Sequence, residues 1–183
     1  MQGGGWRVGA VGIVTAAALL WTAAASAQRM QRTPDIHYVP TPNDVVAAML
    51  SIADVGASDV VYDLGSGDGR IVIAAAKRGA RGVGIELEPS LVAEANKNAR
   101  RAGVADRVSF IEGDIFQTDV SQATVVTLYL LSSINERLKP KLLRELKPGS
   151  RIVSHRFRMG TWEPEKSQKV SGKDVWLWRV PTR

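Results

Sequence analysis

"DLGSGDGR", residues 63 to 70, places three glycines at alternate positions directly after an apolar run. Glycine-rich turns between a strand and a helix often hold a phosphate group on exposed backbone amides. The spacing of Gly65, Gly67 and Gly69, however, puts the third glycine one position too early for the dinucleotide fingerprint G-x-G-x-x-G. No Gly-Lys-Ser/Thr sequence follows, as a Walker-type loop requires. The turn therefore fits a phosphate ligand poorly.

The acidic residues of the turn favour a cationic ligand instead. Asp68 is expected near the N-terminus of the following helix, where a pyrophosphate would need bare amides. Two like charges about 5 Å apart at an effective dielectric near 20 repel by roughly 3 kcal/mol, which lowers affinity about a hundredfold. S-adenosylmethionine carries a sulfonium and an ammonium group, and Asp63 at the end of a strand suits such a cation. A nucleotide-dependent dehydrogenase is the weaker alternative.

Strand-like and helical segments alternate on both sides of the turn. Strands are expected at residues 59–64, 81–88, 107–114 and 123–131, after Gly149, and at 174–181, the last paired with residues near 167–170. Helices are expected at residues 69–79, 89–104 and 133–146, with Pro140 dividing the last, and from an N-cap at Thr41. This alternation predicts a parallel sheet with helices on both faces and ligands at the carboxyl ends of the strands.

Two further acidic residues end the next two predicted strands. Glu86 lies 23 positions after Asp63, where a carboxylate can accept both hydroxyl groups of a ribose. Asp114 can accept a hydrogen bond from the amino group of adenine, with Ile115 and Phe116 against the ring. Three acids at the ends of three successive strands, beside one glycine turn, predict an adenosine-containing cation as the ligand.

The motifs "DLGSGDGR", "GIELE", "EGDIF" and "LKPGS" resemble, in order and spacing, those of the class I, seven-strand S-adenosylmethionine-dependent methyltransferases over roughly residues 36 to 180. The segments "YVPTPNDVVAAML" and "LYLLSSINERLKPKLLRELKPGSRIVSHRF" resemble more narrowly the small lysine methyltransferases that modify the mitochondrial ATP synthase c subunit and adenine nucleotide translocase, and their bacterial relatives.

This resemblance implies a Rossmann-like, doubly wound α/β fold. Its sheet would have seven mostly parallel strands, helices on both faces and one antiparallel strand near the C-terminus. The resemblance implies S-adenosyl-L-methionine as cofactor and a protein lysine as acceptor. The cofactor turn would include Ser66 and Asp68 beside the glycines, and Tyr38 and Thr41 would close over the cofactor.

The residues after the fourth strand bear on the acceptor. "TLYLLSS" stands where amino-methylases of bases and amides carry (D/N)-P-P-(Y/F), so no nucleic acid is expected as a partner. No carboxylate pair lies nearby and the chain has no cysteine, so no metal site is expected. Tyr129 and His155 are the candidate catalytic residues, and core packing is the alternative for each. A small-molecule or lipid acceptor and a non-catalytic cofactor-binding module stay open as alternatives.

The first 27 residues differ from the rest. Arg7 is their one charge, an 18-residue apolar stretch runs from 8 to 25, and Ala25-Ser26-Ala27 suits a signal peptidase. Residues 1–27 are therefore interpreted as a signal peptide or an uncut membrane anchor, 28–38 as a linker and 39–183 as the methyltransferase domain. The domain is expected to be exported to the periplasm or anchored to a membrane, with a protein substrate that can itself be membrane-associated. The net charge of +6 comes from scattered basic residues.

Overall fold

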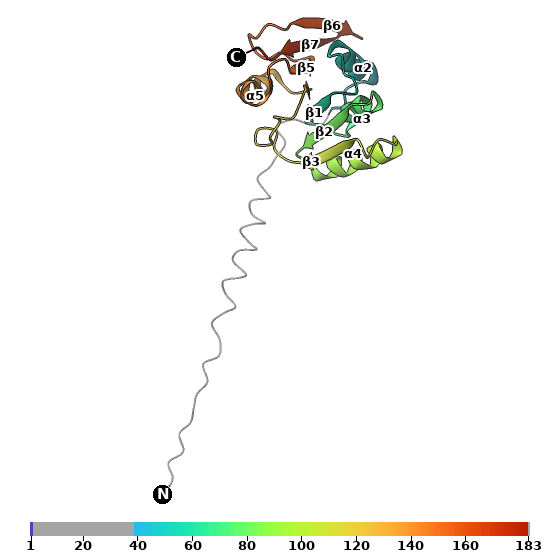
Figure 1. The fold of residues 1–183 in the computed structure, drawn as a ribbon, viewed down its shortest axis with the longest axis vertical. Helices are drawn as coiled ribbons and strands as arrows, with labels where there is room; N and C mark the ends of the chain where they lie inside the picture. The colour runs from blue at the N-terminus through green and yellow to red at the C-terminus, as the bar shows by residue number, and fades with distance from the viewer. Residues whose placement is uncertain (2–38, 183) are drawn as a thin grey trace. The chain divides into compact units, whose positions relative to one another are not determined.

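A computed structural model describes residue 1 and residues 39–182 of the chain. Residues 2–38, which include almost all of the predicted signal or anchor segment, the linker and Tyr38, lie outside the described residues. The domain contains a seven-stranded sheet in the order β3-β2-β1-β4-β5-β7-β6 (Figure 1). The strands are β1 (Val60–Leu64), β2 (Arg81–Glu86), β3 (Val108–Glu112), β4 (Val125–Leu128), β5 (Arg151–His155), β6 (Lys166–Val170) and β7 (Lys173–Arg179). The helices are α2 (Asn43–Ile52), α3 (Arg70–Lys77), α4 (Pro89–Arg101) and α5 (Ser132–Glu145).

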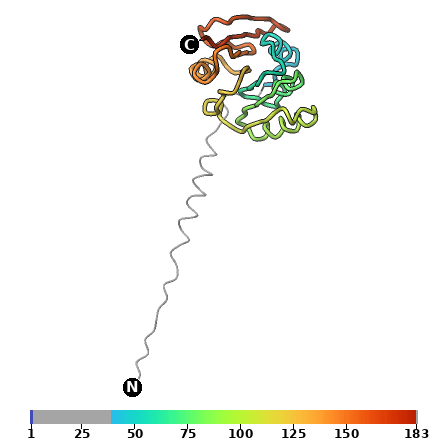
Figure 2. The backbone as a smooth tube through the Cα atoms, in the orientation of Figure 1, coloured from blue at the N-terminus to red at the C-terminus, as the bar shows by residue number. Residues whose placement is uncertain are grey.

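Five neighbouring strands of the sheet, β3, β2, β1, β4 and β5, run parallel to one another. β7 is antiparallel to both of its neighbours, β5 and β6. Figure 2 shows the C-terminal strands, in red, at the edge of the sheet opposite to β3. The predicted mostly parallel sheet with one antiparallel strand near the C-terminus is therefore confirmed.

Successive side chains of each central strand pack alternately into two different hydrophobic cores, one on each face of the sheet. On β1, Val61 packs with residues of α2 and α3, whereas Tyr62 packs with residues of α5. On β5, Val153 packs in the core that contains α2 and α3, and Ile152 packs in the core that contains α5. α5 lies on the opposite side of the sheet from α2, α3 and α4 (Figure 1). Helices thus cover both faces, and the period of two in each strand follows from its two buried sides.

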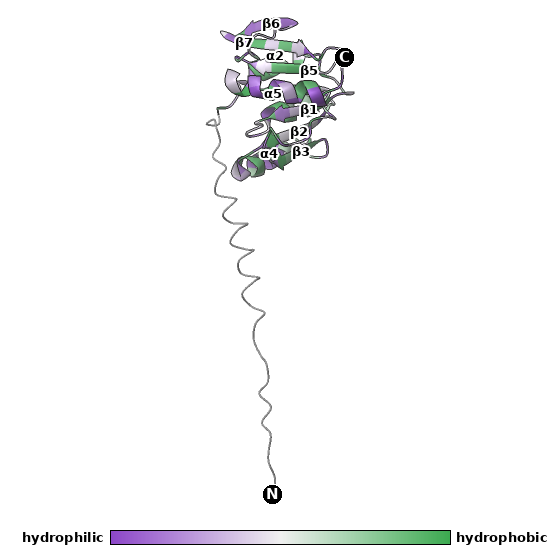
Figure 3. Ribbon diagram, turned by 90° about the vertical axis from the view of Figure 1, so that its left-hand side faces the viewer, coloured by the Kyte–Doolittle hydropathy of each residue, from purple (hydrophilic) through white to green (hydrophobic). Residues whose placement is uncertain are grey.

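The outermost strand, β6, is polar where the inner strands are apolar. Its sequence "KSQKV" leaves the first four residues exposed. Figure 3 shows β6 in purple beside the greener β5 and β7. Lysines on an exposed edge strand discourage pairing with another chain, so this composition suits the end of the sheet.

α5 continues through Pro140, contrary to the expectation that this residue divides the segment into two helices. Ile134, Leu138 and Leu142 form one buried stripe on both sides of the proline. Pro140 itself is exposed, as is Glu136 four residues earlier, so the hydrogen bond that proline cannot donate falls on the solvent side. Burial of the stripe outweighs the unfavourable proline.

The amino ends of the central strands are held by a buried ion pair. Arg151 pairs with Asp59, which is 5% exposed, and donates to the Ala53 carbonyl at 2.6 Å. Thr124 donates to the same Asp59 carboxylate at 2.7 Å. These contacts lie at the strand ends opposite to the glycine turn, so they fix the sheet without taking part in the site.

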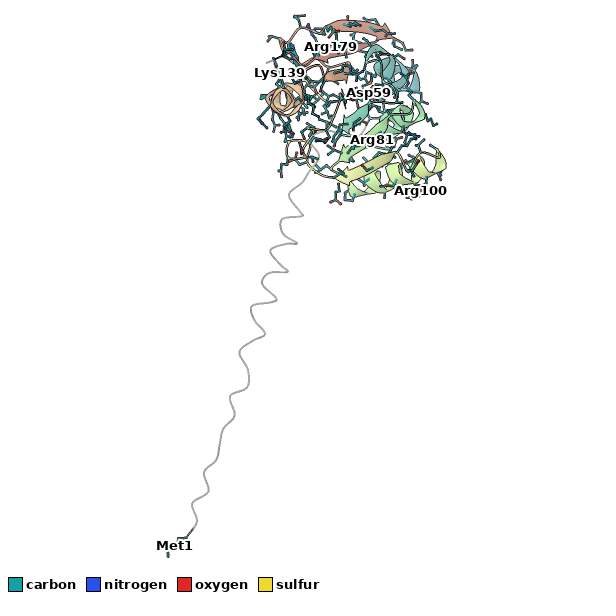
Figure 4. All side chains as sticks on the ribbon, in the orientation of Figure 1. Met1, Asp59, Arg81, Arg100, Lys139 and Arg179 are labelled. Carbon is teal, nitrogen blue, oxygen red and sulfur yellow. The ribbon has the colours of Figure 1, made fainter. Side chains whose placement is uncertain are left out.

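Basic side chains are spread over the domain. Figure 4 labels four of them on four separate elements, Arg81 on β2, Arg100 on α4, Lys139 on α5 and Arg179 on β7. Within residues 39–182 no helix combines the length and the apolar character that crossing a membrane requires.

Candidate active site

The glycine turn joins β1 to α3. All three glycines have positive φ angles, 81° at Gly65, 52° at Gly67 and 80° at Gly69, a region that other residues rarely adopt. A Cβ atom at Gly69 would lie 2.6 Å from the Phe110 ring. The amides of Gly65 and Ser66 donate to the Ile85 carbonyl at 2.8 and 3.0 Å, which fixes the turn against the end of β2.

Asp63 stands near the end of β1 and is only 3% exposed. Its carboxylate accepts a hydrogen bond of 2.7 Å from Thr127 on the neighbouring β4. Burial raises the pKa of Asp63 to about 7, and the charges of Glu86 and Asp68 add to this rise. An ammonium group is the kind of partner that would return such a carboxyl to its ionised form.

Glu86 is the last residue of β2, and its carboxylate faces the glycine turn. It accepts hydrogen bonds from the amides of Gly67 at 2.9 Å, Leu87 at 2.7 Å and Glu88 at 3.1 Å. A carboxylate has about four acceptor positions, so binding both hydroxyls of a ribose would replace part of these amide bonds. The Gly67 contact places Glu86 beside the turn, and its contact with the ribose stays a prediction.

Asp114 follows β3 and organises the turn after it. Its carboxylate accepts from the Phe116 amide at 2.9 Å and from the Gln117 side chain at 3.1 Å. Ile115 and Phe116 are half-buried and pack against the α5 core, and the Arg137 guanidinium lies 4.5 Å above the Phe116 ring. An acid and two apolar side chains thus meet at the end of β3, as an adenine ring would require.

Ser66 supplies an unused polar atom inside the turn. The residue is 5% exposed, and its hydroxyl has no hydrogen-bond partner among the described residues. A Cβ at Gly84 on β2 would lie 2.6 Å from this hydroxyl, so only glycine leaves room for it. A bound ligand with a polar group at this point would satisfy the hydroxyl. The turn, the buried acid and this hydroxyl together fit the adenosine-containing cation expected from the sequence.

Asp68 and Thr41 are joined through Arg70. The Arg70 guanidinium pairs with the Asp68 carboxylate at 2.6 Å and donates to the Thr41 carbonyl at 2.9 Å. The N-cap of α2 is Pro42, contrary to the expectation that Thr41 takes this position. The Thr41 hydroxyl lies 3.4 Å from Nδ1 of His155. The hydroxyl is drawn away from the helix by this buried partner. Cofactor contacts of Asp68 and Thr41 stay predictions.

Tyr129 and His155 meet at the ends of neighbouring strands. β4 ends at Leu128, so Tyr129 is the first residue beyond it, and its ring centroid lies 3.9 Å from that of His155 at 31°. The Phe157 ring lies 6.1 Å from Tyr129 in a stacked arrangement. We call Tyr129, His155 and Phe157 the acceptor edge. Sequence patterns do not indicate Phe157, because the turn that follows β5 has no periodicity.

His155 is fully buried and uncharged. Burial and, to a smaller extent, the nearby charges of Lys173 and Arg156 lower its pKa to about 4, and Asp44 opposes them. Its Nε2 atom has no hydrogen-bond partner among the described residues. The acceptor edge therefore presents three neutral rings and one unused ring nitrogen.

A separate hollow of about 600 Å³ runs along α2 and α3. Val46, Leu50 and Ile73 form part of its wall, and Asp68 is the one predicted site residue that lines it. It follows the helices rather than the carboxyl ends of the strands, so it is distinct from the predicted cofactor site.

Comparison with known proteins identifies the family. A sequence profile of the ANTKMT methyltransferase domain matches residues 63–166. A protein-lysine N-methyltransferase of Saccharolobus islandicus (strain REY15A) is 50% identical over 143 residues, covering 77% of this chain and 89% of that protein. A lysine N-methyltransferase of the ATP synthase c subunit, from Xenopus laevis, is 32% identical over 175 residues, covering 94% of this chain and 77% of that protein.

A solved structure supports the same assignment. The crystal structure described as an RNA methyltransferase from Salinibacter ruber, in complex with S-adenosyl-L-homocysteine, matches with a TM-score of 0.78 and 57% identity. The match covers 79% of this chain and 95% of that one. The expected cofactor is confirmed, and the chain belongs to the ANTKMT methyltransferase domain family of S-adenosylmethionine-dependent methyltransferases.

Proposed function

We propose that the chain transfers a methyl group to the side-chain amine of a protein lysine. The observation that carries this proposal is the acceptor edge, in which the ring centroids of Tyr129 and His155 lie 3.9 Å apart at the ends of β4 and β5. The relatives of Saccharolobus islandicus and Xenopus laevis are both named as lysine N-methyltransferases, which supports an amine as the acceptor.

An uncharged edge suits a lysine acceptor because only the neutral amine is a nucleophile. Burial against aromatic rings and proximity to a positive charge both lower the pKa of a lysine ammonium. Arg156, which follows His155 and is exposed, adds a positive charge at the rim. A carboxylate at the same place would instead hold the lysine in its charged, unreactive form.

The cofactor would be held by the three acidic residues at the ends of β1 to β3. We assign the ammonium group to Asp63, the ribose hydroxyls to Glu86 and the adenine amino group to Asp114, with the glycine turn beneath. When bound, the cofactor supplies a methyl group on a positively charged sulfur, and displacement by the amine leaves neutral S-adenosylhomocysteine. The chain's own part is to position the two partners and to remove water around the amine.

RNA is the second candidate acceptor, because the Salinibacter ruber relative is described as an RNA methyltransferase. Incubation of the full chain with methyl-labelled cofactor and a cell extract separates the candidates. We expect label that protease removes, ribonuclease leaves and acid hydrolysis releases as methyl-lysine. Ribonuclease-sensitive label would favour RNA, and label in the lipid fraction would favour a lipid. Binding of S-adenosylhomocysteine without any transfer would identify a non-catalytic module.

We further propose that the domain works close to a membrane. The apolar stretch from residue 8 to 25 supports this placement as an anchor or as an export signal. A reporter fused to the C-terminus should appear in the membrane fraction or in the exported compartment. A fully soluble cytosolic reporter would contradict membrane proximity and leave the proposed reaction unaffected.

A further inference from the structure

Arg70 connects the glycine turn to the segment that precedes α2. Its Nε and Nη2 atoms donate to the Asp68 carboxylate, at 2.9 and 2.6 Å for the shortest contacts. Its Nη1 atom donates to the Thr41 carbonyl at 2.9 Å. Asn98 of α4 holds the backbone carbonyl of Asp68 at 3.0 Å, so Asp68 is fixed at both its backbone and its side chain.

Thr41 extends this connection to the acceptor edge. The residue is 4% exposed, and its hydroxyl lies 3.4 Å from Nδ1 of His155, which is 114 positions later in the chain. The His155 ring also lies against the Tyr129 ring. A continuous series of contacts therefore leads from the turn after β1 to the rings after β4 and β5.

The backbone on the far side of His155 is fixed as well. Arg156 has a φ of 67°, and the Phe157 amide donates to the His155 carbonyl at 2.8 Å, which defines a γ-turn of the rare, strained kind. The Arg156 amide donates to the Asp174 carbonyl at 2.6 Å. The main chain next to the ring is thus held, and the Thr41 hydroxyl is the hydrogen-bond partner of the ring among the described residues.

We propose that Arg70 and Thr41 are positioning residues that couple the cofactor turn to the acceptor edge. Arg70 fixes the Thr41 backbone relative to the turn, and the Thr41 hydroxyl fixes the orientation of the His155 ring, against which Tyr129 rests. Neither Arg70 nor Thr41 takes part in a chemical step. The inference rests on the proposed acceptor edge, because it assigns these residues to the arrangement of the same rings.

The residue types suit this role. A guanidinium group has five N–H donors in a planar fork, so one arginine can hold a carboxylate and a carbonyl together in a fixed geometry. A lysine ammonium is a single point on a flexible stem, which favours one of the two partners. A threonine hydroxyl both donates and accepts, so it can pair with Nδ1 in either tautomer. Valine has a similar shape and lacks that hydrogen bond.

The direct test is nuclear magnetic resonance of the histidine side chains. The chain has two histidines, His37 and His155, so the ring ¹⁵N signals are few. We expect S-adenosylhomocysteine to shift the His155 signals. Arg70→Lys should shift them as well, because Arg70 donates to the Thr41 carbonyl and the Thr41 hydroxyl contacts His155.

The matched control is Arg78→Lys. Arg78 directly follows α3 and likewise bridges toward α2, because it donates to the Ala47 carbonyl at 3.0 Å and to the Ser51 hydroxyl at 3.1 Å. It lies at the end of α3 away from the turn. This variant should leave the His155 signals and the transfer rate as they are in the unmodified chain.

Kinetics with any acceptor that the extract reveals give a second measurement. Thr41→Val should lower kcat between about 10- and 100-fold through misplacement of the acceptor edge. Thr41→Ser should restore most of the loss. Because the two residues act in series, Arg70→Lys added to Thr41→Val should lower kcat little further.

Unchanged His155 signals in Arg70→Lys would overturn the coupling. Unchanged His155 signals in Thr41→Val would also overturn it, since the Thr41 hydroxyl would then not orient the ring. The histidine spectra need no methyl acceptor, so an RNA or lipid acceptor would refute the lysine proposal without affecting this test.

Discussion

Asp63 is buried at the end of β1, where burial raises the pKa of its carboxyl group to about 7. Near pH 7 this carboxyl group of the free protein is therefore partly protonated. A cofactor ammonium favours the ionised form, so binding should release that proton, and affinity should fall as the pH drops below 7. Calorimetric titration with S-adenosylhomocysteine at pH 7, in two buffers of different ionisation enthalpy, measures the release. Identical apparent enthalpies would contradict the assignment of Asp63.

The same carboxyl group should reduce the stability of the protein without cofactor. The pKa of this group is about 7 in the folded protein, whereas its ordinary value is 3.8. Between pH 3.8 and 7 the native state therefore binds more protons than the unfolded state. Stability then falls as the pH rises from about 4 to 7 and stays reduced above 7. Asp63→Asn should raise the free energy of unfolding at pH 8 by at least about 1 kcal/mol and have little effect at pH 4. It should also abolish cofactor binding. A variant that is less stable at pH 8 would contradict this account.

Gly69 shows why the turn accepts no side chain. Gly69→Ala combines a φ of 80° with a Cβ placed 2.6 Å from the Phe110 ring. We expect a loss of about 2–5 kcal/mol, from about 1–2 for the left-handed backbone and about 1–3 for overpacking. Gly103→Ala is the control, because its φ is 69° and nothing lies within 4 Å of the added Cβ. Equal losses in urea unfolding would show that the Phe110 contact has no effect.

Among the elements, α5 retains a proline that its packing tolerates. Pro140 is exposed inside the helix, where proline is about 3 kcal/mol less favourable than alanine. Pro140→Ala should therefore raise the free energy of unfolding by about 1–3 kcal/mol and leave methyl transfer unchanged. Pro148→Ala, in the exposed turn after α5, serves as control and should lower stability slightly through the unfolded chain. A destabilised Pro140→Ala variant would show that α5 depends on a proline bend.

The elements also show what the sequence could predict. Apolar, β-branched runs located β1, β4 and β5 within a few residues, because these strands are buried on both faces. The predicted break at Pro140 was wrong, because helix propensity considers only the local sequence. The stripe of Ile134, Leu138 and Leu142 becomes buried only when α5 packs on the sheet. The predicted N-cap at Thr41 was wrong likewise, because its partner His155 lies on β5.

Across the whole molecule, the strand order divides the site into two halves. β1, β2 and β3 bring Asp63, Glu86 and Asp114 to one half, and β4 and β5 bring Tyr129 and His155 to the other. The acids could be predicted because each lies at, or just after, the end of a recognisable strand. Contacts between strands, such as Thr127 with Asp63, depend on the order β1-β4 and could not be predicted from spacing alone.

The affinity of a two-part inhibitor tests this division most directly. The compound joins a lysine side chain to the position of the cofactor's methyl group, so it fills both halves at once. We expect it to bind the full chain at least about tenfold more tightly than S-adenosylhomocysteine. Tyr129→Ala should remove that gain while S-adenosylhomocysteine still binds normally. If the compound bound no better than S-adenosylhomocysteine to the unmodified chain, the acceptor edge would not be a lysine site and the account would be contradicted.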